Sequence, residues 1–251
     1  MPHYFASDVH LRFDYPDRDR RFQAWLGRLR PSDALLVVGD LCDFWMGSRS
    51  SDAALMRSPS LQALAAFRES GGSLAIMAGN HDLWMCDRYQ ALLGAEIVRE
   101  PLDMTVMGLR LRIVHGHLLG ARRPWKAVME SRAFFRAFGL TPGLVARPLD
   151  EILAWRNNRG LLADEERHLK VYREYARALA GQTDLVVIGH VHRPVDDHAS
   201  NPRLVVLGGW QKRLSYLVID QGVAHYHIEN DRAQGSPPAT RVDSLPGENR
   251  S

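Results

Sequence analysis

Five short apolar segments of this chain each run directly into a turn rich in Asp, His or Asn. The turns are Asp8-Val-His10, Gly39-Asp40-Leu-Cys-Asp43, Gly79-Asn80-His81-Asp82, His115-Gly-His117 and Gly189-His190-Val-His192. Apolar runs of this length are typical of buried strands, and residues 16–29 and 52–70 carry apolar side chains at helical spacing between them. This alternation predicts an α/β fold. Because ligands of open α/β sheets bind beyond the carboxyl ends of the strands, we expect all five turns to face one site.

The rest of the chain extends this pattern to one domain over residues 1–228. A short helix is expected over 88–93, and a half-buried strand over 104–115, where apolar residues and arginines alternate. Strands that begin near residues 184, 203, 215 and 223 predict a second sheet or mixed pairing. Residues 121–180 are mostly helical in pattern. Residues 229–251 lack apolar periodicity, and we expect a disordered tail there.

The composition of the five turns predicts a metal centre. They hold four Asp, one Asn and six of the eleven His, whereas two cysteines are too few for an all-cysteine zinc site. Imidazole nitrogens with carboxylate and amide oxygens suit first-row metal ions. The first ion can be surrounded by Asp8, His10, Asp40 and His192, and the second by Asn80, His115, His190 and a shared Asp40. Two ions about 3.5–4 Å apart form a clamp used for phosphate ester hydrolysis.

Four further side chains of the turns are not needed as ligands. His81 follows Asn80, where it can protonate the leaving alkoxide or stabilise charge on the phosphoryl group. Asp43 or Asp82 can hold the His81 imidazole in the required tautomer, and we favour Asp43. His117 is expected near the metals, either as a ligand or behind the ligands. Ordinary surface or strand positions are expected for His3, His168, His198, His225 and His227.

The motifs D-x-H, G-D-x-x-D, G-N-H-D, H-G-H and G-H-x-H, in this order, resemble those of the calcineurin-like metallophosphoesterases. The resemblance covers roughly residues 4–228. It implies a four-layer α/β/β/α sandwich with two central mixed sheets. It also implies two divalent ions, commonly Mn, Fe or Zn with Mn favoured here, and hydrolysis of phosphomonoesters, phosphodiesters or pyrophosphates. The family's ligand division matches the one given above.

Within this family the chain is most similar to the UDP-2,3-diacylglucosamine pyrophosphatases of lipid A synthesis. The similarity is carried by SDVHL at 7–11, GDLCDFW at 39–45, GHVHRP at 189–194, LGGW at 207–210 and SYLVID at 215–220. The best-known branch has Arg at the position of His81 and an H-G-D turn in place of His115-Gly-His117. These departures indicate a sister group, and the resemblance implies a lipid-linked nucleotide as substrate.

Residues 121–177 form the segment expected to select the substrate. They contain twelve basic and seven acidic residues, a net charge of +5, against +3 for the whole chain. Because this segment interrupts the core between the fourth and fifth motifs, we expect a helical cap within 121–180. Its candidate substrate contacts are Arg122, Arg123 and Lys126 for a diphosphate, and Asn157, Asn158 and Arg159 for a head group. The apolar face of the cap can hold acyl chains, rest on an anionic membrane surface, or pack between helices.

Charge and hydropathy limit the remaining possibilities. A net charge of +3 is small for a protein that coats nucleic acid, so we expect an anionic phosphate-containing substrate instead. Nowhere do 18 apolar residues run together, and the first residues contain no apolar stretch of 7–15 residues, so we expect neither a membrane-spanning helix nor a signal peptide. We therefore expect a cytoplasmic protein that can contact the inner face of a membrane. Two other functions stay open: a phosphodiesterase for cyclic nucleotides or nucleic acid, and a metal-binding scaffold without activity. No feature of the sequence indicates an oligomeric state.

Overall fold

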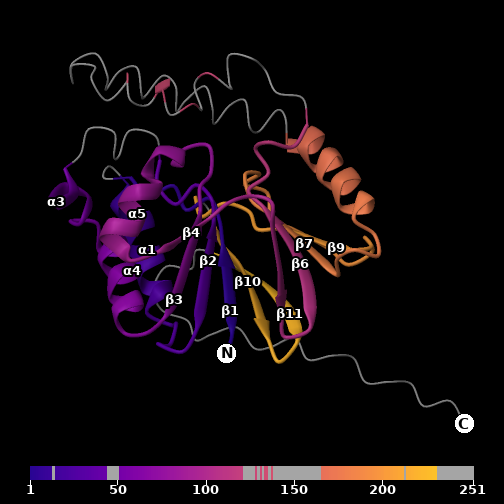
Figure 1. Ribbon diagram of the computed structural model, residues 1–251, viewed down its shortest axis with the longest axis horizontal. Helices are drawn as coiled ribbons and strands as arrows, with labels where there is room; N and C mark the ends of the chain where they lie inside the picture. Colours follow the sequence, from indigo (N-terminus) through magenta and orange to yellow (C-terminus); the bar gives the residue numbers. More distant parts are fainter. Residues whose placement is uncertain are drawn as a thin grey trace, which may run out of the picture.

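The computed structural model describes residues 1–12, 15–43, 51–120, 165–211 and 213–230, with residues 128, 131, 133, 134 and 137. Within these residues, two mixed β-sheets lie face to face, and helices cover the outer side of each sheet (Figure 1). The order of layers is therefore helix, sheet, sheet, helix. This confirms the α/β/β/α arrangement that the sequence predicts.

The first sheet has six strands in the order β11-β10-β1-β2-β3-β4. Its parallel part consists of β1 (His3–Ala6), β2 (Ala34–Val38), β3 (Ser73–Met77) and β4 (Glu96–Val98). On the other side of β1, β10 (Arg213–Asp220) pairs antiparallel with it and with β11 (Val223–Asn230). Strand β2 is apolar throughout because both faces are covered: Leu35 and Val37 face the helices, and Leu36 and Val38 face the second sheet.

The helices α1 (Pro16–Leu26), α4 (Pro59–Glu69) and α5 (Cys86–Leu93) cover the outer face of the first sheet (Figure 1). Two shorter elements, α3 (Asp52–Leu55) and η1 (Leu83–Met85), precede α4 and α5. Buried Asp19 joins α1 to the start of α4, since its carboxylate accepts hydrogen bonds from the Ser58 hydroxyl and the Ser60 backbone N–H, both at 2.8 Å. The helical layer is thus fixed by a polar contact as well as by apolar packing.

The second sheet has five strands in the order β5-β6-β7-β9-β8. They are β5 (Leu102–Val106), β6 (Leu109–Val114), β7 (Leu185–Ile188), β8 (Val195–Asp197) and β9 (Arg203–Val206), of which β6, β7 and β9 are parallel. A helix over 165–178 covers the outer face of this sheet, where Leu169 and Tyr172 pack with Val186 and Ile188. Three apolar cores therefore fill the three interfaces between the four layers.

Several element boundaries differ from those expected. The helix expected over 52–70 is divided into α3 and α4, because the Ser58 hydroxyl caps a new helix at Pro59, whose ring nitrogen has no proton for the preceding turn. The strand expected over 104–115 is a β5–β6 hairpin that turns at Met107 and Gly108, both at positive φ. Strand β11 continues to Asn230, so residues 229 and 230 belong to the sheet rather than to the tail.

The segment expected to form the cap is described only in part. Its residues 165–178 are the outer helix of the second sheet, so this portion belongs to the four layers. Most of residues 121–164 and all of 231–251 lie outside the described residues, and the expected cap contacts and tail lie there. Among the described residues, no helix is long and apolar enough to span a bilayer.

Candidate functional site

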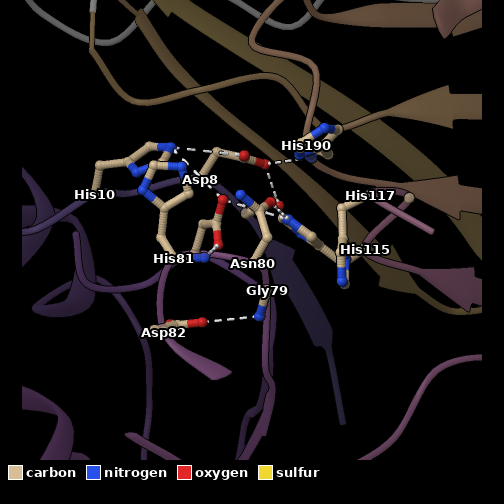
Figure 2. A network of polar contacts seen from close by, with 12 residues as sticks. Asp8, His10, Gly79, Asn80, His81, Asp82, His115, His117 and His190 are labelled. Atoms are coloured by element: carbon tan, nitrogen blue, oxygen red, sulfur yellow. Dashed lines mark hydrogen bonds and ion pairs between the residues drawn. The ribbon is translucent and has the colours of Figure 1, made fainter. Parts of the chain in front are cut away.

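The five polar turns converge at one end of the two sheets, as the sequence predicts. Each follows a parallel strand: Asp8 follows β1, Asp40 follows β2, Asn80 follows β3, His115 follows β6 and His190 follows β7. Figure 2 shows the side chains of Asp8, Asn80, His115 and His190 directed toward a common centre from both sheets. The site therefore spans the interface between the sheets. The pairing of β1 with β2 and of β6 with β7 sets the spacing of the turns within each sheet.

One group of side chains has the arrangement expected for the first ion. Asp8, His10 and His192 each offer a ligand atom, and these atoms lie within 4.8 Å of one another. The Asp8 Oδ1 atom lies 3.7 Å from His10 Nε2 and 3.6 Å from His192 Nε2. The two imidazole Nε2 atoms are 3.0 Å apart. These three ligand atoms are close enough together for a single cation to contact all of them.

A second group matches the expectation for the other ion. Asp40, His115 and His190 also offer atoms within 4.8 Å of one another. The His115 Nε2 atom lies 3.3 Å from both Asp40 Oδ2 and Asn80 Oδ1. Asp40 Oδ2 is also 4.0 Å from His10 Nε2 of the first group. Asp40 therefore lies between the two groups, which is the position a bridging carboxylate requires.

The backbone at these turns adopts conformations that L-residues seldom adopt. Asp8, His10, Asp40 and His190 have φ values of 53°, 51°, 52° and 66°. Non-glycine residues in this region carry strain that clusters at functional sites. A Cβ atom on Gly79 would overlap the Asp40 carboxylate. The φ of Gly79 is not positive, so its backbone conformation does not require glycine. Glycine is required here because the Asp40 carboxylate packs directly against the Gly79 backbone.

Buried charges of opposite sign stabilise one another in the site. Burial alone would raise the pKa of the Asp8 carboxyl, but the imidazoles of His10 and His192 hold that pKa well below its usual range. The Asp40 pKa is likewise held low against burial, chiefly by His115. Burial opposes a charge on His115, yet Asp40 raises the pKa of this imidazole to about 10. Both carboxylates are therefore ionised and ready to bind a cation.

The donor set fits divalent ions in one further respect. Asp8 Oδ2 accepts hydrogen bonds from the Ser7 hydroxyl and from the His190 backbone N–H, the latter at 2.8 Å. Asp8 Oδ1 is buried and has no hydrogen-bond partner among the described residues. One oxygen is therefore used to fix the carboxylate, and the other faces the centre. Burying an anionic oxygen without a donor is costly, and a bound cation removes that cost.

His81 lies at the edge of the first group, and its imidazole contacts a carboxylate. With His10 and Asp40 it also forms a third set of ligand atoms that lie within 4.8 Å of one another. Its Nδ1 atom is 2.8 Å from Asp43 Oδ1, and its ring lies 4.7 Å from the His10 ring. The His81 and Asp43 side chains are 7% and 12% exposed. Arg12 Nη1 lies 3.4 Å from the other Asp43 oxygen. Burial would raise the Asp43 pKa, but His81 first, and then His10 and Arg12, hold it below its usual range.

Asp82 has a different place, behind the turns. Its Oδ2 accepts hydrogen bonds from the Leu41 N–H at 2.9 Å and from the Tyr89 hydroxyl at 2.8 Å. Its Oδ1 accepts the Gly79 N–H at 2.8 Å (Figure 2). Burial and the nearby Asp40 raise the Asp82 pKa. Asp82 therefore joins the second and third turns, while Asp43 is the carboxylate that contacts His81.

Two side chains near the second group were missed in the sequence. Glu100 lies between β4 and β5, and its Oε1 is 3.2 Å from His117 Nδ1. His168, expected at an ordinary position, has its ring 5.5 Å from the His190 ring because the helix over 165–178 packs beside β7. The register of the β5–β6 hairpin offers a signal for Glu100, since counting back from the turn sets residue 100 opposite 115. No spacing rule points to His168.

The predicted substrate contacts Arg122, Arg123, Lys126, Asn157, Asn158 and Arg159 all lie outside the described residues. The remaining predicted site residues are within the site or directly behind it. The described site therefore contains the predicted metal ligands and the predicted His81–Asp43 pair, but not the predicted substrate contacts.

The sequence matches the family model for calcineurin-like phosphoesterase over residues 1–194, which include all five turns. UDP-2,3-diacylglucosamine hydrolase of Hahella chejuensis is 28% identical over 230 residues, covering 86% of this chain and 92% of that protein. The Haemophilus influenzae protein of the same name is 22% identical over 222 residues, covering 86% and 93%. Among solved structures, an archaeal phosphodiesterase aligns at 13% identity and a TM-score of 0.46, over 91% of this chain and 99% of its own. The sequence match and the convergent turns together establish that this chain belongs to the calcineurin-like phosphoesterase family.

Proposed function

We propose that this phosphoester hydrolase cleaves the diphosphate bond of a lipid-linked nucleotide of the UDP-2,3-diacylglucosamine type. Relatives that span most of the chain carry the name of that hydrolase. The observation that supports the proposal best is the pair of ligand groups joined at Asp40, with the His81–Asp43 pair beside them. These residues would suit a dinuclear centre of the kind that hydrolyses phosphate bonds.

The first ion would be held by Asp8, His10, Asp40 and His192, and the second by Asp40, Asn80, His115 and His190. Carboxylate, amide and imidazole ligands suit Mn, Fe or Zn, and manganese is the ion we favour. When bound, the two ions supply a water of lowered pKa and neutralise charge on the phosphoryl oxygens.

The chain's own part in the reaction falls to His81 and Asp43. Asp43 accepts a hydrogen bond from His81 Nδ1, which fixes the ring and the tautomer. In the imidazolium form, with Nδ1–H turned to Asp43, the Nε2–H of His81 can give its proton to the leaving oxygen, and the neutral imidazole remains. The oxygen of water bonds to one phosphorus, the bridging P–O bond breaks, and both products are phosphomonoesters.

A hydrolysis panel tests the proposal. The purified chain, loaded with Mn²⁺, is given UDP-diacylglucosamine, a cyclic nucleotide, single-stranded DNA and bis(4-nitrophenyl) phosphate. We expect the diphosphate to have the highest kcat/KM, and Asp40→Asn to lose turnover on every substrate together with bound metal. A higher kcat/KM for the cyclic nucleotide or DNA would assign the chain to a phosphodiesterase instead. No turnover of any substrate by the metal-loaded protein would leave a binding scaffold.

A further inference from the structure

A second carboxylate–imidazole pair lies on the opposite side of the centre from His81 and Asp43. Glu100 Oε1 is 3.2 Å from His117 Nδ1, and the two side chains are 10% and 7% exposed. The His117 side chain is thus as buried as that of His81. Neither Glu100 nor His117 belongs to a ligand group among the described residues. A role other than binding one of the two ions is therefore open to the pair.

Glu100 divides its two oxygens between the backbone and the imidazole. Oε2 accepts hydrogen bonds from the backbone N–H of His115 at 2.7 Å and of Gly116 at 3.2 Å. Oε1 faces the His117 ring. One carboxylate thus fixes the path of the turn by two hydrogen bonds and places its second oxygen against the ring that ends the turn, at 3.2 Å but without hydrogen-bond geometry. A residue with a purely structural role in the turn would need only the first of these contacts.

The helix over residues 165–178 also contacts the His115-Gly-His117 turn. The Tyr172 hydroxyl donates to the Gly116 carbonyl oxygen at 3.4 Å. Gly116 has a φ of 101°, and a Cβ there would overlap Ile188 and the Tyr172 hydroxyl. The turn therefore has little freedom. The position of His117 is set by the packing around it as well as by Glu100.

His117 lies beside the ligands of the second ion. Its ring centre is 5.3 Å from that of His115 and 6.3 Å from that of His190 (Figure 2). His81, in contrast, lies 4.7 Å from His10 of the first group. The two carboxylate–imidazole pairs therefore flank the two ends of the centre. A substrate with a single phosphorus needs an imidazole at one end of the centre only. A diphosphate carries a second phosphoryl group, which would extend toward the imidazole at the other end.

We propose that Glu100 is a positioning residue that holds His117 against the second phosphoryl group of a diphosphate substrate. The carboxylate limits the movement of the ring by its close contact with Nδ1, and the imidazole contacts a non-bridging oxygen of the phosphate that leaves. The pair thereby selects diphosphates over esters with a single phosphorus. This inference rests on the diphosphate activity proposed above, and it adds the residues that would distinguish diphosphates from simpler esters.

The test compares two substrates in three variants. His117→Gln, Glu100→Gln and the double variant are loaded with Mn²⁺ and assayed on UDP-diacylglucosamine and on bis(4-nitrophenyl) phosphate. We expect His117→Gln to lower kcat/KM for the diphosphate about 10- to 100-fold, the range for one lost hydrogen bond to a charged group. The aryl ester should change less than about threefold, and metal content should stay unchanged. Glu100→Gln should follow His117→Gln, and the double variant should be no worse than His117→Gln alone.

A matched control is available in the exposed pair of His198 and Asp196, which are 3.1 Å apart outside the five turns. His198→Gln should leave both substrates unchanged. Equal losses on both substrates, or losses that follow the metal content, would overturn the inference and make Glu100 a support of the ligand turn only. If Glu100→Gln does not fold, the two-substrate comparison in His117→Gln decides the matter. A wild-type chain that cleaves the aryl ester but no diphosphate would contradict the proposed function itself, a different failure from equal losses in the variants.

Discussion

Replacing His81 by alanine separates proton transfer from metal binding. His81 is outside the ligand set expected from the sequence. Its ring centre lies 4.7 Å from that of His10, however, and His81 offers an atom within 4.8 Å of ligand atoms of His10 and Asp40. Alanine removes the imidazole and its 2.8 Å contact with Asp43. Asp43 keeps Arg12 Nη1 at 3.4 Å, so a cation still faces the buried carboxylate in the variant. We therefore expect the chain to fold and to bind both ions.

The expected loss of activity in His81→Ala follows from the role of His81 as a general acid. A positioned general acid contributes on the order of 10²–10⁴-fold to the rate, which corresponds to about 3–5 kcal/mol of transition-state stabilisation. The loss should depend on the leaving group, because a nitrophenolate leaves without protonation and an alkoxide does not. We expect His81→Ala to lose the larger factor on an alkyl phosphodiester and about tenfold or less on bis(4-nitrophenyl) phosphate.

Steady-state kinetics with the two esters, together with metal analysis of the same samples, check this prediction. Asp43→Asn serves as a companion, since it keeps the size of the side chain but removes the charge that orients His81. A loss of metal from His81→Ala in proportion to the loss of activity would show that His81 is a ligand and would contradict its role as a general acid. An equal fold-loss in the rate of hydrolysis of both esters would also contradict that role.

Two further predictions concern protonation and stability. Because Asp40 raises the pKa of His115 to about 10, the metal-free chain carries a proton on this ring below that pH, and ligation must release it. Metal titration calorimetry at pH 8 in buffers of different ionisation enthalpy should show proton release, and its absence would contradict the ligand role of His115. Asp19→Ala should lower the free energy of unfolding by about 1–3 kcal/mol, because buried donors of Ser58 and Ser60 lose their acceptor. Urea denaturation measures this loss against the exposed control Asp17→Ala, and equal stability of the two variants would show that the contact contributes nothing.

The convergence of the candidate metal ligands could be predicted from the sequence because these residues occur in short motifs at strand ends. Asp8, Asp40 and His190 each follow an apolar run, and parallel strands bring their carboxyl ends together without further information. The layer order follows in the same way from strands such as β2, which are apolar on both faces and therefore need cover on both.

Residues that depend on tertiary packing could not be predicted in this way. His168 reaches His190 only because Leu169 and Tyr172 seat its helix on the second sheet, and no spacing in the sequence encodes that docking. Glu100 is a single carboxylate outside any motif, and its place opposite His115 becomes visible only when the hairpin at Met107 and Gly108 is recognised. Such contacts are set by the register between elements rather than by a local pattern.

The most direct test of the account is metal stoichiometry combined with activity on bis(4-nitrophenyl) phosphate. The chain is stripped with a chelator, metal is returned stepwise as Mn²⁺, and bound ions and turnover are measured at each step. The joined ligand groups at Asp40 predict two ions per chain, no turnover in the stripped protein, and activity that recovers as the second ion binds. A stripped protein that hydrolyses the ester at the full rate, or full activity with one ion bound, would contradict the dinuclear site.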